Sequence, residues 1–173
     1  MDEARFGLKV WFRRRWCPTG GRPSWIVEDR YEWLWLYAAI EPTTGESFFL
    51  FLPRLDGPCF ELFLQEFRHA FPATRVTLVC DNSGSHTSGQ VAWPQGLTPL
   101  GLPAYSPELN PTERLFKELR EALANQVFDT LDDLEQALTA ALRPYWEHPQ
   151  TLGRLTAYPW WRQGVAYIMT SSQ

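Results

Sequence analysis

The longest uninterrupted apolar run of the chain, Trp33 to Ile40, is short and is followed by a turn, and this restricts the fold more than any other feature. The run is far below the roughly 20 residues that a membrane-spanning helix needs, so the sequence predicts no membrane span. The segments Tyr31–Ile40 and Ser47–Leu52 are both rich in aromatic residues, and Pro42 to Gly45 between them is typical of a turn. We therefore predict an antiparallel hairpin here.

The rest of the chain alternates between strand and helix patterns. Short apolar segments predict strands at Arg5–Phe12, at Arg75–Cys80 and, irregular because of Pro99, at Leu97–Leu102. Apolar residues at helical spacing predict helices from Pro58 to near Pro72, from Asn110 through Leu123, and from Thr130 to Pro144. Asp133 lies three residues after Thr130, as in a capping box. This order of elements indicates a single mixed α/β domain.

Composition narrows the class of protein further. With 173 residues, 45% hydrophobic and 15% aromatic, the chain can build a core without disulfides or a structural metal, and disorder is disfavoured. Three cysteines without a CxxC pair indicate reduced thiols in a cytosolic protein. No signal peptide opens the chain, so secretion is not indicated.

Charge is unevenly distributed along the chain. The net charge is −4 and the pI is about 5.4, which by itself argues against a strongly basic nucleic-acid-binding surface. Residues 1–30 nevertheless carry seven basic and four acidic side chains, a net charge of +3. The remainder therefore carries −7. General electrostatics would bring an anionic ligand to the first thirty residues.

Three acidic residues lie where a predicted strand or helix begins or ends. They are Asp2, Asp81 and Glu113, and carboxylates gathered from such ends suit hard cations such as Mg²⁺. Each also has a simpler interpretation: Asp2 as a solvated terminal acid, Asp81 as an Asx turn, and Glu113 as the partner of Asn110 in a capping box. Spacing alone favours the capping box.

Nearby polar residues are equally open to simple interpretations. His86 would more often be a surface or hydrogen-bonded histidine than a catalytic one. Neither Ser83 nor Ser85 lies in a GxSxG elbow, which disfavours a serine hydrolase.

Four segments, in order, resemble one known family. Residues 102–117, LPAYSPELNPTERLFK, closely resemble the signature of DDE transposases of the mariner superfamily, bacterial insertion-sequence branch. Residues 79–86, VCDNSGSH, resemble that family's second motif, and Asp2 to Leu8 resemble its first. The loop from Arg15 to Pro23 resembles the segment after the family's first strand.

The resemblance implies a ribonuclease-H-like fold, a mixed five-stranded sheet flanked by helices, with Asp2, Asp81 and Glu113 as the catalytic, metal-binding acids. The 31 residues between Asp81 and Glu113 match the family's usual separation. Glu108 matches a variable acid and is not assigned to the metal. Glu3 follows Asp2 directly, and on a strand the two side chains point to opposite faces, so only one of them can join the cluster.

The implied chemistry is DNA phosphodiester cleavage and strand transfer at transposon ends, with two Mg²⁺ ions or Mn²⁺ as a substitute. Double-stranded DNA, both transposon ends and target, is the implied partner. Five residues are expected to contact the DNA backbone: Arg13, Arg14, Arg15, Arg22 and His86. A homodimer, or an assembly with an N-terminal DNA-binding portion, and a bacterial cytoplasmic location, at the nucleoid when bound to DNA, are also implied.

Some features depart from the family pattern. Phe116 replaces the usual tryptophan, Thr112 an aliphatic residue, and only Met1 precedes Asp2, without an N-terminal helix-turn-helix domain. We expect a catalytic domain at 1–145 and a tryptophan-rich tail at 146–173 that packs on the body or forms an interface. Two functions stay open: an active transposase domain, and a truncated, non-catalytic remnant that at most binds DNA or a partner chain. A host nuclease of the same fold is a third and less favoured interpretation.

Overall fold

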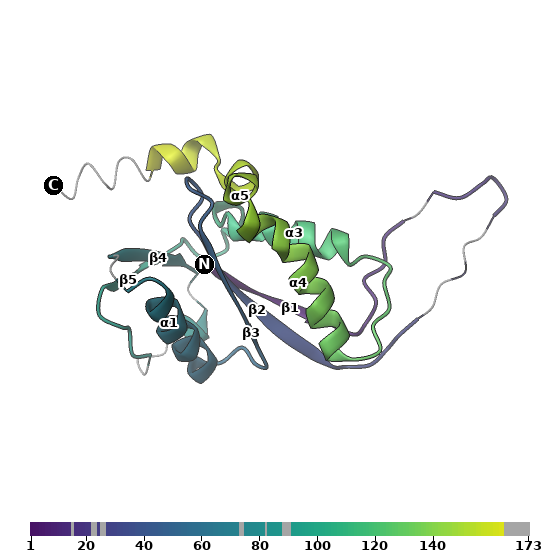
Figure 1. The fold of residues 1–173 in the computed structure, drawn as a ribbon, viewed down its shortest axis with the longest axis horizontal. Helices are drawn as coiled ribbons and strands as arrows, with labels where there is room; N and C mark the ends of the chain where they lie inside the picture. The colour runs from purple at the N-terminus through teal and green to yellow at the C-terminus, as the bar shows by residue number, and fades with distance from the viewer. Residues whose placement is uncertain are drawn as a thin grey trace.

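The computed structural model describes residues 1–14, 16–21, 24, 27–72, 75–81, 83–87 and 91–164 (Figure 1). The described elements are, in chain order, β1 (Asp2–Gly7), β2 (Trp33–Ile40), β3 (Ser47–Leu52), α1 (Gly57–Ala70), β4 (Val76–Cys80), α2 (Gly84–Thr87), β5 (Leu97–Gly101), the 3-10 turn η1 (Pro107–Leu109), α3 (Thr112–Ala122), α4 (Leu131–Glu147) and α5 (Pro149–Thr156).

The first sheet contains the predicted hairpin. β2 lies in the middle, antiparallel to β1 and β3, with Asp2 opposite Ala38. The turn between β2 and β3 forms because the Glu41 carboxylate accepts hydrogen bonds from the backbone N–H groups of Thr43 and Thr44. Gly45 has a φ of +80°, which favours glycine at that position. The hairpin prediction is confirmed.

β4 and β5 form a separate two-stranded parallel sheet. Among the described residues the strands therefore assemble as three and two, and the predicted five-stranded sheet is not confirmed. The amino group of Met1 donates a hydrogen bond to the Val79 carbonyl of β4, so the start of β1 reaches the second sheet at one point. Pairing between β1 and β4 does not continue from there, because β1 begins at Asp2 and leads away into the first sheet.

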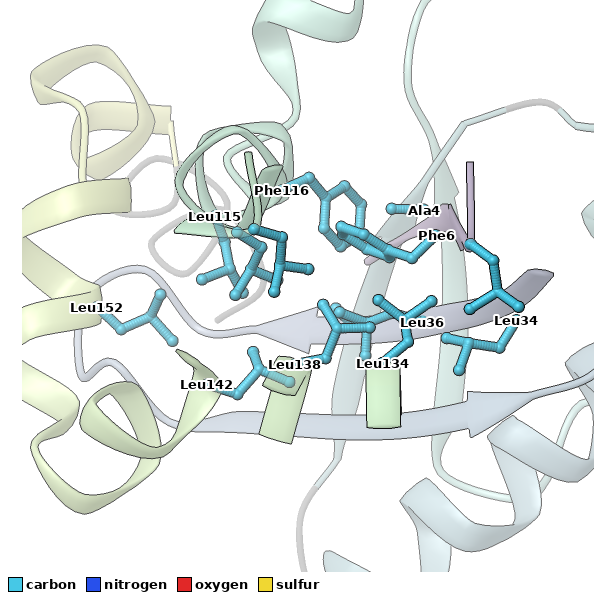
Figure 2. Packing of buried hydrophobic residues seen from close by; sticks show 14 residues of the cluster. Ala4, Phe6, Leu34, Leu36, Leu115, Phe116, Leu134, Leu138, Leu142 and Leu152 are labelled. Atoms are coloured by element: carbon cyan, nitrogen blue, oxygen red, sulfur yellow. The ribbon is translucent and has the colours of Figure 1, made fainter. Parts of the chain in front are cut away.

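Helices cover both faces of the first sheet, and alternation along β2 explains why. Leu34 and Leu36 face α3 and α4, where they pack with Leu115, Leu138 and their neighbours (Figure 2). Tyr37 faces the other way, into the aromatic cluster of α1 that also includes Leu78 of β4. A strand that is apolar on both faces is typical of a buried central strand.

Several boundaries differ from the expected ones. The first strand ends at Gly7 instead of reaching Phe12: the Leu8 N–H still bonds the Glu32 carbonyl, but the chain then leaves the sheet, and Trp11 and Phe12 are about half exposed. α4 continues past Pro144 to Glu147, because its other residues keep the helix docked through Leu134, Leu138 and Leu142.

The tail begins within α4 and continues as α5, which packs against α3 and α4 and fully buries Leu152 and Thr156. The division into domains at residue 145 stays a prediction. Phe116 is fully buried in the cluster between the sheet and α4, so it fills its position without an indole ring. Over the described part of the chain, no helix is both long and apolar enough to cross a membrane.

Candidate active site

Asp2 opens β1 on the face of the sheet that α3 covers. Its carboxylate accepts the backbone N–H of Glu3 at 2.9 Å. Burial, together with the negative charge of Glu113, raises the pKa of Asp2 to about 7. The acids of β1 and α3 therefore interact electrostatically, and the repulsion between them disfavours the charged form of Asp2.

Asn110 holds Glu113 near the start of β1. Its side chain is buried, accepts the backbone N–H of Thr112 at 3.1 Å, and donates to the carbonyl of Met1 at 3.1 Å. One amide thus caps the beginning of α3 and ties it to β1. The expected capping box does not form: the Asn110 side chain accepts from Thr112 and not from Glu113, and the Glu113 carboxylate lies toward Arg120, with Oε2 and Nη1 3.8 Å apart. The sequence predicted Asn110 only as a helix cap, and its hydrogen bond to Met1 was not predicted.

Asp81 follows β4 and is about half exposed. Its Oδ1 accepts the backbone N–H of Ser83 at 3.0 Å, so the expected Asx turn is present. The same Oδ1 lies 2.8 Å from Nδ1 of His86. The carboxylate is therefore held from one side by the turn and from the other by a ring nitrogen.

His86 links Asp81 to Glu3. Its side chain is only 2% exposed, and Nε2 lies 2.8 Å from Oε1 of Glu3, which is 4% exposed. The ring also packs on Phe60, with centroids 4.5 Å apart. Burial alone lowers the pKa of His86, but the hydrogen bond and charge of Glu3 outweigh it and hold that pKa above its ordinary value.

The side chains of the two adjacent acids in β1 thus point to opposite faces of the sheet, as expected. Asp2 interacts with Glu113, and Glu3 contacts His86. The sequence assigned Asp2 to the metal cluster in place of Glu3, and the contact of Glu3 with His86 was not predicted. The signal available was an acid in the first motif and a histidine in the second.

The donor atoms fit a hard divalent cation. Asp2, Asp81 and Glu113 offer carboxylate oxygens, and the raised pKa of Asp2 identifies a carboxyl group whose charge a cation would compensate. In the described residues, however, no three acidic, histidine or cysteine side chains lie close enough together to hold an ion. The chemistry of the donors suits Mg²⁺ or Mn²⁺, while the three carboxylates are not gathered into one coordination group.

The basic residues expected to contact DNA lie mainly after β1. Arg13 forms an ion pair with Glu121, and its backbone N–H donates to Asn125 at 2.9 Å. Arg14 is exposed, and Arg15 and Arg22 lie outside the described residues. The described parts of residues 10–32 extend away from the sheet (Figure 1). His86, also expected at DNA, is buried instead.

The mixed α/β fold resembles that of the ribonuclease-H-like catalytic domain of Mos1 transposase. More specifically, the chain belongs to the DDE superfamily endonuclease family, whose sequence model matches residues 1–135. It is also 28% identical over 130 residues to the uncharacterized protein y4pE/y4sA of Sinorhizobium fredii, covering 74% of this chain and 96% of that protein.

Solved structures of Mos1 transposase share the fold. A pre-cleavage Mos1 transpososome has a TM-score of 0.66 at 18% identity, over 90% of this chain and 52% of that one. The Mos1 mariner paired end complex with Mn has a TM-score of 0.63 at 22% identity, over 90% of this chain and 52% of that one. The Mos1 strand transfer complex has a TM-score of 0.61 at 19% identity, over 88% and 50%. The chain thus spans about half the length of these transposases.

Proposed function

We propose that this chain is the catalytic domain of a transposase, which cleaves DNA phosphodiester bonds and transfers strands at transposon ends. The observation that carries the proposal is the half-buried Asp2 carboxyl, whose pKa is raised by burial and by the charge of Glu113, in a chain of the DDE endonuclease family. Asp2, Asp81 and Glu113 are the proposed catalytic and metal-binding residues. Mg²⁺, with Mn²⁺ as a substitute, is the proposed cofactor, as two ions.

In this scheme the three acids would supply metal ligands from three different parts of the fold. When bound, the metal lowers the pKa of a water or a DNA 3′-hydroxyl and stabilises the leaving oxygen. Asp2 and Glu113 supply ligands from β1 and α3, and Asn110 sets the distance between these elements. Asp81 supplies a ligand from the end of β4, and Ser83 and His86 fix its orientation. His86 is thus a positioning residue here, where we had expected a DNA contact.

The proposed partner is double-stranded DNA. Arg14 is exposed and available for a backbone contact, and Arg15 and Arg22 stay predictions. Arg13 could reach DNA only by leaving Glu121. Mos1 transposase appears in its solved structures as paired-end and strand transfer complexes. For this chain, a homodimer or an assembly with an N-terminal DNA-binding portion, acting in the bacterial cytoplasm at the nucleoid, is the corresponding proposal.

Calorimetric titration with Mn²⁺ tests the site directly. We expect saturable binding by the full chain and its loss in Asp81→Asn and in Glu113→Gln, because each removes a charged oxygen ligand. Glu108→Gln is the matched control, since Glu108 lies five residues before Glu113 and is outside the proposed cluster. Equal binding by all four proteins would refute the assignment.

A nicking assay on supercoiled DNA then separates the two functions that remain open. The non-catalytic remnant is favoured by one observation, that the described acids do not form a closed metal group. Mn²⁺-dependent nicking that disappears in Asp81→Asn supports the transposase. Metal binding without nicking, when DNA and an N-terminal DNA-binding portion are supplied, supports the remnant.

A further inference from the structure

The strand β3 forms an outer edge of the first sheet. It pairs with β2 on one side, and over the described residues no strand pairs with its other side. Its sequence, SFFLFL, contains no proline and no charged residue, which are common devices that keep an edge strand from pairing with another chain. By contrast, β5 in the second sheet contains Pro99. The outer edge of β3 is therefore open to strand addition.

The hydrogen bonds of the hairpin show which backbone groups of β3 point outward. The Glu41 N–H donates to the Glu46 carbonyl, and this pair continues the register of the β2–β3 ladder. In an antiparallel ladder, residues that bond to the neighbouring strand alternate with residues that do not, so the even-numbered residues of β3 bond to β2. The N–H and C=O groups of Ser47, Phe49 and Phe51 therefore point away from β2.

These outward groups fit a second copy of the same strand. When two β3 strands lie antiparallel about a two-fold axis at Phe49, this residue lies opposite its own counterpart, and Ser47 lies opposite Phe51 of the other copy. Each of these pairs can then exchange both of its backbone hydrogen bonds. A shift by one residue would instead bring outward-pointing groups opposite groups that already bond to β2. The backbone of β3 is thus complementary to itself in this register.

Pairing of this kind would also cover apolar side chains. Phe48, Phe49, Leu50 and Phe51 are all only half-buried. Phe49 and Phe51 lie on the side of α4, and Phe48 and Leu50 lie on the side of α1. The ring of Trp146 packs on Phe49, with centroids 6.3 Å apart, and Trp146 is 40% exposed. Because Phe49 lies on the axis, the exposed Trp146 rings of two copies would come near each other there.

Opposite charges flank the apolar strand. Glu46 precedes β3 and Arg54 follows it; both are exposed, and neither forms an ion pair with any residue that the structure describes. The Tyr37 hydroxyl donates to the Arg54 carbonyl at 2.9 Å, which places Arg54 on the α1 side of the sheet. In the two-fold pairing, Glu46 of one copy lies opposite Leu52 of the other on that same side, close to Arg54. Each end of the paired strands thus brings a negative charge to a positive one.

We propose that β3 is the surface through which two copies of this chain pair, antiparallel about a two-fold axis at Phe49, so that their three-stranded sheets form one continuous sheet. A second copy is the partner because the register, the axis and the charges complement β3 itself, as a two-fold interface requires. Backbone bonds supply affinity, and the flanking charges supply specificity. The proposal goes beyond the transposase function and does not depend on it, since an inactive chain would present the same edge.

Sedimentation equilibrium of the full chain tests the pairing. We expect a reversible equilibrium between monomer and dimer. Ser47→Pro removes an outward N–H at each end of the paired strands and leaves the bonds to β2 intact, so it should weaken dimerisation at least about tenfold. Ser47→Ala keeps that N–H and is the matched control, which should dimerise like wild type. Circular dichroism confirms that both variants fold.

Exchanging the flanking charges tests the orientation of the two strands. Glu46→Arg and Arg54→Glu each bring like charges together at both ends, and each should weaken dimerisation. The double variant restores opposite charges and should recover the affinity of wild type. A mixture of the two single variants should form heterodimers, because each positive pair then meets a negative one.

Hydrogen exchange locates the interface. The amides of Ser47, Phe49 and Phe51 should exchange at least about tenfold more slowly at concentrations where the dimer predominates than where the monomer does. The amides of Phe48 and Leu50, which bond to β2, should be unchanged. A chain that stays monomeric at millimolar concentration, equal dimerisation of Ser47→Pro and wild type, or protection outside β3 would overturn the proposal. These measurements involve neither metal nor DNA, so their failure would leave the transposase proposal intact.

Discussion

Asp2 and Glu3 are neighbours in the chain and occupy unlike surroundings. Asp2 meets another negative charge, Glu113, whereas Glu3 is buried against His86. A buried carboxylate is tolerated only with a hydrogen-bonding partner, and His86 supplies it. The arrangement connects the beginning of β1 with Asp81, which follows β4, through a single ring.

Replacing Glu3 by alanine should therefore lower the free energy of unfolding. The variant leaves Nε2 of the buried His86 ring without its partner, and we expect a loss of about 2 kcal/mol in urea unfolding. Glu66→Ala is the matched control, because Glu66 makes only an exposed contact with His69 and should change stability by less than about 0.5 kcal/mol. Similar values for the two variants would contradict a structural role for Glu3.

Glu41 gives stability that depends on pH. Burial alone raises its pKa, but hydrogen bonds from Thr43 and Thr44 outweigh this and lower the pKa below its ordinary value of 4.5. The stabilisation by Glu41 is therefore fully present above the pKa that this carboxyl has in the unfolded chain. It is lost as the pH falls through the lower pKa of the same carboxyl in the folded protein. We expect wild type to exceed Glu41→Gln in stability at pH 7 and to lose most of that advantage by about pH 3. Thermal unfolding of both proteins across this pH range measures the difference in stability. A difference that becomes larger in acid would contradict the prediction.

At the level of elements, local patterns predicted much of the fold. The hairpin followed from two apolar segments around a turn, and α4 began where Thr130 and Asp133 form the expected capping box. Sequence could not predict the gap between β1 and β4, because it depends on how distant segments pack. Likewise, nothing local showed that Leu152, in a short helix with a glycine next to it, would be fully buried and anchor α5.

The capping box of α4 can be tested by itself. Thr130→Ala removes the hydroxyl that accepts the Asp133 N–H and donates to the Asp133 carboxylate, and we expect a loss of about 1 kcal/mol in the free energy of unfolding. Thr139→Ala, inside the same helix, should stay within about 0.5 kcal/mol of wild type. A Thr130→Ala protein as stable as wild type would mean that packing alone fixes where α4 starts.

At the scale of the whole molecule, the sequence predicted which residues belong to the candidate site but not how the fold brings them together. Asp2, Asp81 and Glu113 were identified from motifs, yet the described structure places their interactions in two groups: Asp2 with Glu113, and Asp81 with His86. Motifs give residue types and order, whereas the placement of β1 relative to β4 depends on the side chains that pack between the two sheets.

Metal binding should stabilise the whole fold if the proposed site forms. A ligand that binds only the folded state adds about 2.7 kcal/mol at one hundred times its Kd. We therefore expect Mn²⁺ to raise the Tm of wild type and of Glu108→Gln, and to leave that of Asp81→Asn unchanged. Scanning calorimetry with and without Mn²⁺ measures this, and an equal rise in all three proteins would indicate binding elsewhere.

The alternation along β1 has a consequence for how such a chain can change over generations. A point substitution at Glu3 or Ala4 alters one contact, but inserting or deleting a single residue between Met1 and Phe6 moves every later or earlier side chain to the other face. Asp2 would then point at the aromatic side and Glu3 at Glu113. Homologues of this domain should therefore tolerate substitutions in the first strand far better than insertions or deletions in it.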